Sequence, residues 1–488
     1  MSLFSWAGVL ALILGGLYGS LFGAIPGLTA TLAVALFVPV AFFLDPVIAL
    51  PAIIAISSVA IYAGDVGSAV ARIPGTPASA AYVVELHAIA RERGPIYGLG
   101  ISALGSAAGG AVGTGVLVLG ATFIAAIAAQ FSSFEYFWVA ILGLTAGVFA
   151  SSGSALKSLI SLLLGLLLAT VGIDPTLGYP RFHFGSPMLL GGLDYVVAMI
   201  GLFGFSEVLE HSFQKSSHRG AAPTVQLRRT LRQFFAAPLK LIRRSWMLVA
   251  RSSFLGVFIG FLPGAGADVG AWVATSAQKM MRRDNTPEDT VLAGSSSNNA
   301  AVASAWIPAL SLGLPGDTVT AMVLAIFLMK GITPGPLLFE NDLALVWSLY
   351  LTFLVANIVL LPVFGYLAAR LAALTLRVRF NVLLSAITAI CVVGAYALRN
   401  NPADVWIMAL MGAFAFVLRR GGFPLAQVVL GMVLGPILEQ HFMVSAIKSR
   451  WNLASFFERP VALLLMASTL ITIGIGIWLR IRSRNKAA

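Results

Sequence analysis

Charged residues are scarce in this chain of 488 residues, making up 10% of it against 59% hydrophobic residues. Soluble domains carry about 25% charged residues, so no water-soluble packing could cover this much apolar surface. The apolar stretches are continuous and do not alternate with period two, which excludes a membrane β-barrel. The composition therefore predicts an all-α polytopic membrane protein.

Residues that bind metals, form disulfides or drive catalysis are also few. The single cysteine, Cys391, excludes an intrachain disulfide, and the five histidines are scattered without metal-ligand spacing. No His-Glu-x-x-His or Gly-x-Ser-x-Gly motif is present, which disfavours a membrane-embedded hydrolase. The net charge of +12 comes from basic residues at helix ends and in one linker, without the aromatic–basic interleaving of nucleic-acid binders. We therefore expect no metal, no cofactor, no nucleic acid and no enzyme activity.

The apolar segments predict about 12 transmembrane helices at roughly 20 residues per span. Some segments are too short to cross a bilayer and are interpreted as halves of broken or re-entrant helices. A basic linker without acids covers 211–245, which predicts that it is cytoplasmic. It separates a first membrane repeat, 1–210, from a second, 246–440, and 441–488 adds a last membrane helix with a basic tail.

Two Pro-Gly motifs occur in matched pairs. Gly23–Ala30 (GAIPGLTA) corresponds to Gly260–Ala267 (GFLPGAGA), and Arg72–Ser79 (RIPGTPAS) corresponds to Gly313–Thr320 (GLPGDTVT). The prolines of the first pair are 237 residues apart and those of the second pair are 241 apart. Two similar halves with paired breaks in apolar sequence are typical of secondary transporters with discontinuous helices.

The distribution of basic residues predicts that the two repeats are inverted. Between its two breaks, the first half carries Asp45 and no Lys or Arg, whereas the second half carries Lys279 and two arginines. After the second break the order is reversed, because Arg91 and Arg93 lie in the loop of the first half, whereas the corresponding loop of the second half holds Glu340 and Asp342. Equivalent loops therefore fall on opposite sides of the membrane.

The Pro-Gly breaks predict a binding site. Proline stops a helix and glycine permits a sharp turn. Within a membrane, such breaks expose helix N-termini that suit an anion and carbonyl groups that suit sodium. The alternative is that the small residues serve helix packing alone. The residues expected to bind substrate are Pro26, Gly27, Thr29, Pro74, Gly75, Thr76, Ser79, Pro263, Gly264, Gly266, Asn298, Asn299, Pro315, Gly316 and Thr318.

The paired amides belong to a polar run, Gly294–Asn299, which we expect at a helix start, as a cap or in a polar cavity. A surface loop is the alternative. Acids near the breaks are functional candidates by default, because an ionisable residue inside a membrane is costly. Of these, Glu85 is expected in water beside Arg91 and Arg93. The residues expected to couple transport to a cation are Asp65, Asp268, Asp317 and Ser295.

At these motifs the chain resembles the large membrane subunit of the tripartite tricarboxylate transporters, the TctA family. Gly331–Pro336 matches as well, and the resemblance covers nearly the whole chain. It implies uptake of an organic carboxylate, tri- or dicarboxylate, across the bacterial inner membrane. A periplasmic binding protein would deliver the substrate, and a small four-helix membrane subunit would complete the complex. A Na⁺ or H⁺ gradient would supply the energy, and an elevator-type movement would carry the substrate.

The chain also departs from the family pattern. Ser295 stands where the family often has Glu before the paired asparagines, and Tyr82–Leu86 replaces a Thr-x-x-Asp-Gly pattern. These departures and the additional aspartates leave the carboxylate and the coupling ion open. A single-component symporter without a binding protein is the first alternative, and a channel is a weaker one. A homodimer is possible, because elevator-type scaffolds often pair.

Overall fold

The computed structural model describes residues 6–25, 27–150, 154–213, 231–264, 266–281, 284–375 and 380–487. In these ranges the protein is almost entirely helical, and two short strands pair as an antiparallel hairpin. Nine described helices are long and apolar enough to cross a membrane, and five shorter apolar helices accompany them. The prediction of an all-α polytopic membrane protein is confirmed.

The chain before the linker forms a series of helices that ends near residue 213. Its elements are α1 (Trp6–Ala24), α2 (Ala30–Phe43), α3 (Pro46–Ala63), α4 (Asp65–Ala71), η2 (Ser79–Ala81), α5 (Val83–Arg93), α6 (Pro95–Ala128), α7 (Ser133–Ala150), α8 (Ala155–Ala169), β1 (Gly172–Ile173), β2 (Pro180–Arg181), η3 (Pro187–Leu189), α9 (Tyr195–Met199), the π-helix η4 (Ile200–Phe205) and α10 (Ser206–Phe213).

The chain after residue 230 forms the remaining helices. Its elements are α11 (Leu231–Arg244), α12 (Trp246–Phe261), α13 (Gly266–Met281), α14 (Pro287–Ser304), α15 (Trp306–Leu312), α16 (Thr318–Met329), α17 (Pro336–Asn341), α18 (Leu343–Val355), the π-helix η5 (Ala356–Leu360), α19 (Leu361–Thr375), α20 (Phe380–Arg399), α21 (Pro402–Arg420), α22 (Leu425–Lys448), η6 (Leu453–Phe457) and α23 (Pro460–Ala487).

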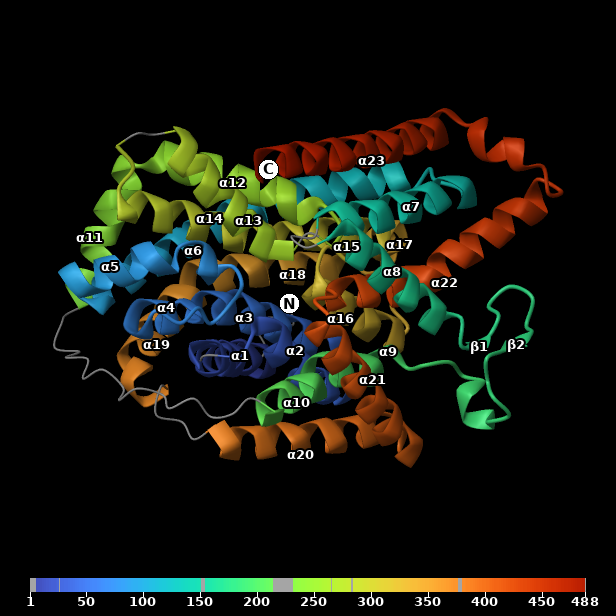
Figure 1. The fold of residues 1–488 in the computed structure, drawn as a ribbon, viewed down its shortest axis with the longest axis horizontal. Coiled ribbons are helices and arrows are strands. Elements are labelled where there is room, and N and C mark those ends of the chain that lie inside the picture. The colour runs from blue at the N-terminus through green and yellow to red at the C-terminus, as the bar shows by residue number, and fades with distance from the viewer. Residues whose placement is uncertain are drawn as a thin grey trace.

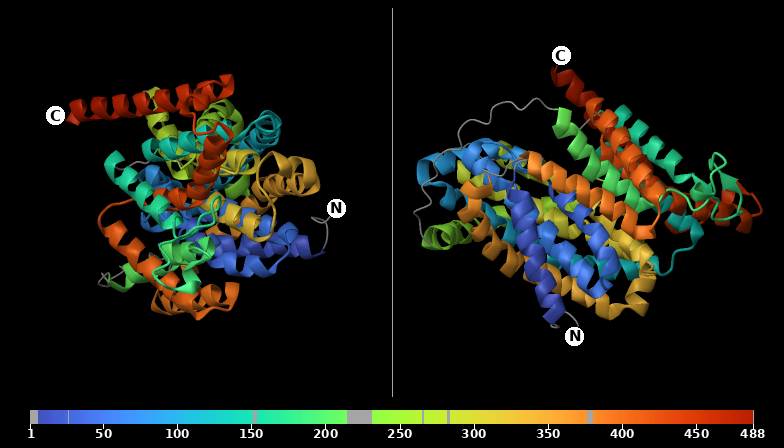
Figure 2. Two further views of the ribbon diagram at one scale, coloured as in Figure 1. Left: turned by 90° about the vertical axis from the view of Figure 1, so that its right-hand side faces the viewer. Right: turned by 90° about the horizontal axis from the view of Figure 1, so that it is seen from below.

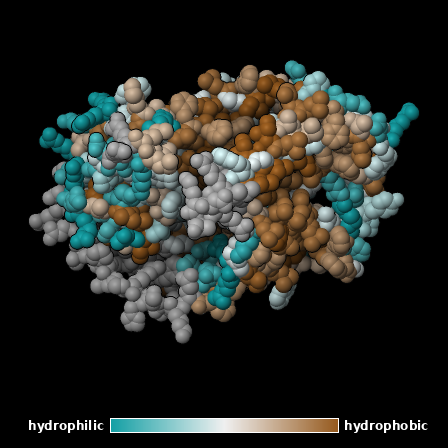
Figure 3. Space-filling model, turned by 45° about the horizontal axis from the view of Figure 1, so that its top comes forward, coloured by the Kyte–Doolittle hydropathy of each residue, from teal (hydrophilic) through white to brown (hydrophobic). Residues whose placement is uncertain are grey.

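The molecule is elongated, and long helices such as α7, α20 and α23 run along its long axis (Figure 1). Helices α5 and α11 lie at one end, and the β1–β2 hairpin projects from the other, as the further views also show (Figure 2). On the face shown in Figure 3, hydrophobic residues cover much of the middle, while hydrophilic residues gather toward both ends. This pattern fits a bilayer whose normal follows the long axis.

One helical arrangement occurs twice. In the first half α3 begins at Pro46, a kink at Gly64 leads into α4, and the helix ends at Arg72 in the left-handed conformation. In the second half α14 begins at Pro287 and ends, after α15, at Gly313 in the left-handed conformation. Each of these features recurs 241 residues later. The paired motifs thus lie at the ends of similar kinked helices. The repeat boundaries 1–210 and 246–440 stay predictions.

Small residues let these kinked helices pack closely against their neighbours. In the first half, a Cβ atom on Gly19 or Gly23 of α1 would lie 2.6 or 2.2 Å from a carbonyl oxygen of α3. In the second half, a Cβ atom on Gly256 or Gly260 of α12 would lie 2.1 or 2.2 Å from a carbonyl oxygen of α14. The contacts recur at equivalent positions, so the sequence repeat preserves a helix-to-helix packing mode.

Helix α14 lies at the centre of the packing, against α6, α12 and α13. All residues of 289–304 are buried. The polar run Gly294–Asn299 therefore lies within a buried helix, and the expectation of a helix start there is wrong. The helix begins earlier, at Pro287, where Thr286 and Asp289 form a capping box. Acids in a first turn favour a helix N-terminus, and Glu288 and Asp289 lie in the first turn of α14.

The basic linker contains a helix that the sequence reading missed. Residues 214–230 lie outside the described residues, whereas 231–244 form α11. Phe234 and Pro238 face the protein and are buried, while Arg243 and Arg244 are exposed. A Cβ atom on Gly100 of α6 would lie 2.4 Å from the Phe234 carbonyl oxygen, so α11 is tightly docked.

The packing of α6 on α14 predicts unequal effects of two substitutions in one helix. A Cβ atom at Gly109 would lie 1.9 Å from the Ser296 carbonyl oxygen, whereas nothing lies within 4 Å of one at Gly115. We expect Gly109→Ala to cost about 1–3 kcal/mol through overpacking. Gly115→Ala should be neutral or stabilising by up to about 1 kcal/mol. Thermal unfolding of the detergent-solubilised protein measures both, and equal midpoints would contradict the packing described here.

Candidate functional site

Hydrogen bonds connect the four Pro-Gly breaks. The breaks are numbered in chain order: residues 25–29, 72–78, 262–266 and 313–317. The third and fourth breaks meet where the Gly264 N–H donates to the Gly316 carbonyl oxygen at 2.8 Å. The helices after the first and fourth breaks, α2 and α16, meet where the hydroxyl groups of Thr31 and Thr318 lie 3.1 Å apart.

Helix α13 joins the second break to the third. The Ala78 N–H donates to the Asp268 carboxylate at 3.1 Å, and the Trp272 indole N–H donates to the Pro77 carbonyl oxygen at 3.1 Å. Together with the contacts above, these hydrogen bonds link all four breaks. The first break is linked to the fourth, the fourth to the third, and the third to the second. The structure thus brings together the four breaks that the sequence placed at least 43 residues apart in each half.

The second and fourth breaks end in matching caps. At the second break, the backbone N–H of Ser79 donates to the Thr76 hydroxyl, and the Thr76 N–H donates to the Ser79 hydroxyl, both at 3.1 Å. At the fourth, the Thr320 N–H donates to the Asp317 carboxylate, and the Asp317 N–H donates to the Thr320 hydroxyl, both at 2.8 Å. Asp317 therefore holds the place of Thr76 and serves as a helix cap.

The glycines at these two breaks allow close contact between backbones. The Gly75 N–H donates to the Gly64 carbonyl oxygen at 3.1 Å, and a Cβ on Gly75 would lie 2.6 Å from that oxygen. A Cβ on Gly316 would lie 2.6 Å from the Ala305 carbonyl oxygen. Gly75 and Gly316, both predicted ligands, thus let each turn pack against the kink of the helix that precedes it.

At the first break, Thr29 caps α2 by accepting the N–H of Leu32 at 3.2 Å, while Pro26 lies outside the described residues. Gly27 has a φ of 93°. Gly266, at the third break, has a φ of 70° and opens α13. Both glycines therefore take the backbone conformation that their turns require.

Two predicted cation ligands lie apart from the breaks. Asp65 is buried at the start of α4, where it accepts hydrogen bonds from the Tyr82 hydroxyl at 2.9 and 3.1 Å and from the Ser102 hydroxyl. The Ser295 hydroxyl donates to the Leu292 carbonyl oxygen of its own helix at 3.4 Å. Their cation roles stay predictions.

The predicted ligands Asn298 and Asn299 are buried in the middle of α14. The Asn299 side chain donates to the Ser58 carbonyl oxygen of α3 and to Asn357 of η5. No hydrogen bond joins either amide to a break in the described part of the chain. The paired asparagines thus belong to a second polar cluster within the helix core.

Arg72 is a candidate that the sequence reading passed over. It has a φ of 56°, which is left-handed and unfavourable for arginine, whereas Gly313 holds the equivalent position with a φ of 69°. Its side chain is exposed and makes no ion pair or hydrogen bond within the described ranges. A strained basic residue beside a helix break is a functional signal. The signal in the sequence was the first basic residue of the chain, next to Ile73-Pro74-Gly75.

Equivalent residues of the second and fourth breaks differ in exposure. Ile73 is 46% exposed, whereas the equivalent Leu314 is 3% exposed. Pro74 is exposed and the equivalent Pro315 is buried. The fourth break borders a cavity of about 10 Å³, closed on one side by Ala426, Val429 and Leu430 of α22. This volume holds about one water molecule. The second break is therefore open while the fourth is covered.

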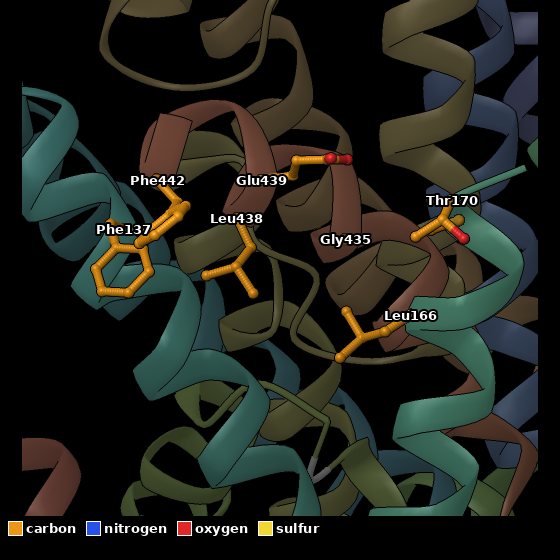
Figure 4. Close-up of a pocket in the computed structure, with 8 residues that line it drawn as sticks. Phe137, Leu166, Thr170, Gly435, Leu438, Glu439 and Phe442 are labelled. Carbon is orange, nitrogen blue, oxygen red and sulfur yellow. The ribbon is translucent and has the colours of Figure 1, made fainter. Parts of the chain in front are cut away.

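A larger cavity lies between α7, α8 and α22 and has a volume of about 300 Å³ (Figure 4). Its walls are mainly apolar, with Phe137, Leu166 and Leu438 among them. The charged residue that lines it is Glu439, which pairs with Arg181. None of the predicted site residues lines this cavity, and an acidic, apolar wall does not suit a carboxylate.

Comparison with known proteins gives one family and two relatives. The model of the tripartite tricarboxylate transporter TctA family matches residues 9–430. An uncharacterized 52.8 kDa protein in the TAR-I ttuC' 3'region of Agrobacterium vitis is 32% identical over 482 residues, covering 96% of this chain and 93% of that protein. An uncharacterized protein in the TAR-II ttuC' 3'region of the same organism is 32% identical over 240 residues, covering 47% of this chain and 97% of that protein. No solved structure matches the chain.

The matching caps give a direct test of the role of Asp317. Asp317→Thr places the residue of the equivalent cap at the fourth break, and we expect its thermal stability to match that of the wild-type protein. Asp317→Ala removes the cap and should cost about 1 kcal/mol. Thermal unfolding of the purified variants separates the two. If both substitutions were equally destabilising, the carboxylate would have a role that a hydroxyl group cannot replace.

Proposed function

The chain belongs to the tripartite tricarboxylate transporter TctA family, and from this premise we propose that it is the permease that moves an organic carboxylate across the bacterial inner membrane. The family consists of transporter components, which agrees with a multi-pass membrane protein whose described helices include nine candidate spans. The tri- or dicarboxylate class follows from the family, and the residues at the breaks supply the chemistry for it.

The substrate carboxylate binds at the joined breaks. Helices α2, α13 and α16 begin there, with 14, 16 and 12 residues, and their N-termini direct partial positive charge toward an anion. The hydroxyl groups of Thr31 and Thr318 add neutral donors. Arg72 adds a planar, permanently charged group that suits a carboxylate.

The substrate reaches this site from each side of the membrane in turn. The unequal exposure of equivalent residues at the second and fourth breaks is the single observation that carries this proposal. In two inverted repeats, one break can be open while its equivalent is covered. A movement of one part of the protein against the rest would exchange the open and the covered break, and so the side of the membrane from which the site is reached. We propose that this movement is elevator-type, with the breaks carried past a scaffold that includes α22.

The transport complex contains further parts. A periplasmic binding protein delivers the carboxylate, and a small four-helix membrane subunit completes the assembly, as the tripartite family implies. A Na⁺ or H⁺ gradient drives uptake, with Asp65, Asp268, Asp317 and Ser295 as candidates for coupling. The permease forms a homodimer in the bilayer, in which the scaffolds of the two copies pair.

Uptake into proteoliposomes tests this function. The permease is reconstituted with its small membrane subunit, and a binding protein loaded with labelled citrate, succinate or an aromatic acid is added outside. A sodium gradient and a proton gradient are imposed separately. We expect uptake that requires the binding protein and one of the two gradients.

Other results would change the assignment. Uptake of free substrate without the binding protein would indicate a single-component symporter. Uptake that follows the substrate gradient alone, with both ion gradients collapsed, would indicate a channel or a uniporter and would overturn ion coupling.

The proposed role of Arg72 predicts opposite effects on stability and transport. Arg72→Gly places glycine in a left-handed position, and we expect the protein to become more stable by roughly 1 kcal/mol. Uptake should fall at least tenfold because the cationic ligand is lost. Arg450 is also exposed and left-handed, with a φ of 51°, so Arg450→Gly is the matched control. It should gain similar stability and keep uptake, and equal uptake in the two variants would remove Arg72 from the site.

A further inference from the structure

A buried polar cluster lies where four helical elements meet, away from the four breaks. It contains Ser58 of α3, Asn299 of α14 and Asn357 of η5, each buried to about 1% exposure or less. Gly110 of α6 closes the fourth side, because a Cβ atom there would lie 2.0 Å from the Asn357 amide oxygen. None of these residues is ionisable. A π-turn such as η5 is frequent at functional sites.

Two oxygen atoms of the cluster have no hydrogen-bond partner among the described residues. The Asn299 amide nitrogen lies 3.2 Å from the Ser58 carbonyl oxygen and 3.4 Å from the Asn357 amide oxygen. The Asn357 amide nitrogen donates to the Phe353 carbonyl oxygen at 2.9 Å. The Ser58 hydroxyl and the Asn299 amide oxygen have no hydrogen-bond partner among the described residues. A buried, unsatisfied polar atom in a native protein calls for a water or an ion.

A half-turn of the Asn299 amide converts the cluster into a cage of oxygens. The nitrogen and oxygen of an amide are exchangeable by this rotation, which changes only the hydrogen bonds. The Asn299 oxygen would then take the place that is 3.2 and 3.4 Å from the other two oxygens. Ca²⁺ holds oxygen ligands at about 2.3–2.6 Å, so neighbouring oxygens in an octahedron around an ion of that size are about 3.3–3.7 Å apart. The 3.4 Å spacing falls in this range and the 3.2 Å spacing lies just below it. The buried, unpartnered Ser58 hydroxyl is the candidate for a fourth ligand.

From this geometry we propose that Ser58, Asn299 and Asn357 form a binding site for a sodium ion. Neutral oxygens suit a monovalent cation, whereas Ca²⁺ sites normally include carboxylates. A proton is disfavoured as the bound species, because the cluster has no group that titrates. The site places the cation in the helix core, apart from the acids near the breaks.

The three aspartates expected to couple transport to a cation are already engaged by donors. Asp268 accepts the Ala78 N–H, Asp317 accepts the Thr320 N–H and hydroxyl, and Asp65 accepts two hydroxyl groups. A cation at any of them would have to displace or reorient these donors. In the cluster at Asn299, by contrast, two oxygen atoms have no hydrogen-bond partner among the described residues, which leaves them available to a cation.

The position of the cluster also connects cation binding to the movement proposed for transport. Ser58 and Asn299 are 241 residues apart and hold equivalent places in the two kinked helices, so the cation would bind where the halves face each other. Its use as the coupling ion rests on the proposed transport function, whereas its binding does not.

Sodium binding is measured on the purified full-length permease without substrate. Thermal unfolding is followed in NaCl and in KCl or choline chloride at equal ionic strength, together with ²²Na⁺ binding. We expect NaCl alone to raise the unfolding midpoint by a few degrees, in a saturable way. Equal midpoints in all salts, with no ²²Na⁺ bound, would mean that the cluster holds water only and would overturn the proposal.

Four substitutions locate the ion. Ser58→Ala and Asn357→Ala should each raise the NaCl concentration for half the effect at least tenfold. Ser68→Ala is the matched control, because Ser68 is a buried serine of the same candidate span whose hydroxyl also has no partner. Asn357→Asp keeps the oxygen and adds charge, so it should bind sodium more tightly or admit Ca²⁺. If Asn357→Ala fails to fold, this change in cation binding by Asn357→Asp still tests the proposal.

Two outcomes separate this proposal from the transport function. Loss of the sodium effect in Asp268→Asn, with Asn357→Ala unchanged, would move the cation to the breaks and overturn the site. Sodium binding that depends on Asn357, in a permease whose uptake ignores the sodium gradient, would keep the site and remove its coupling role.

Discussion

The structure depends on one requirement, that each backbone N–H and C=O group in a bilayer finds a partner within the protein. Broken helices violate this requirement locally, and the backbone near the breaks satisfies it by bonding to another break or to a neighbouring helix. The Gly264 N–H reaches Gly316, the Gly75 N–H reaches Gly64, and the Gly335 N–H reaches Leu310 at 2.9 Å. The breaks are thus held together at the ends of several helices, where we propose that the carboxylate binds.

Close packing is the second consequence. Glycines on α1, α6 and α12 bring neighbouring backbones against α3 and α14, so the kinked helices are held from several sides. Such packing leaves little room for long side chains, and the polar residues within it are small. The amides of Asn298 and Asn299 in α14 lie buried within this packing.

The two halves have similar backbone structures but carry different residues at equivalent positions. Equivalent positions carry Thr76 and Asp317 in the caps, and Ser58 and Asn299 in the core. Arg72 stands where the other half has Gly313, and there the strained residue is exposed while the glycine is buried. The same scaffold thus presents a basic, open break in one half and a covered break in the other.

The sequence by itself determined the membrane class, the α-helical fold and the places where helices break, because composition, proline and glycine act locally. It also paired the motifs, since a repeat is visible as spacing. The tertiary structure alone decided that Thr31 meets Thr318, 287 residues away, and that Asn299 meets Ser58 and Asn357. It also showed that the polar run lies within α14 and that α11 docks on α6. These contacts depend on how whole helices pack, which no local pattern of residues specifies.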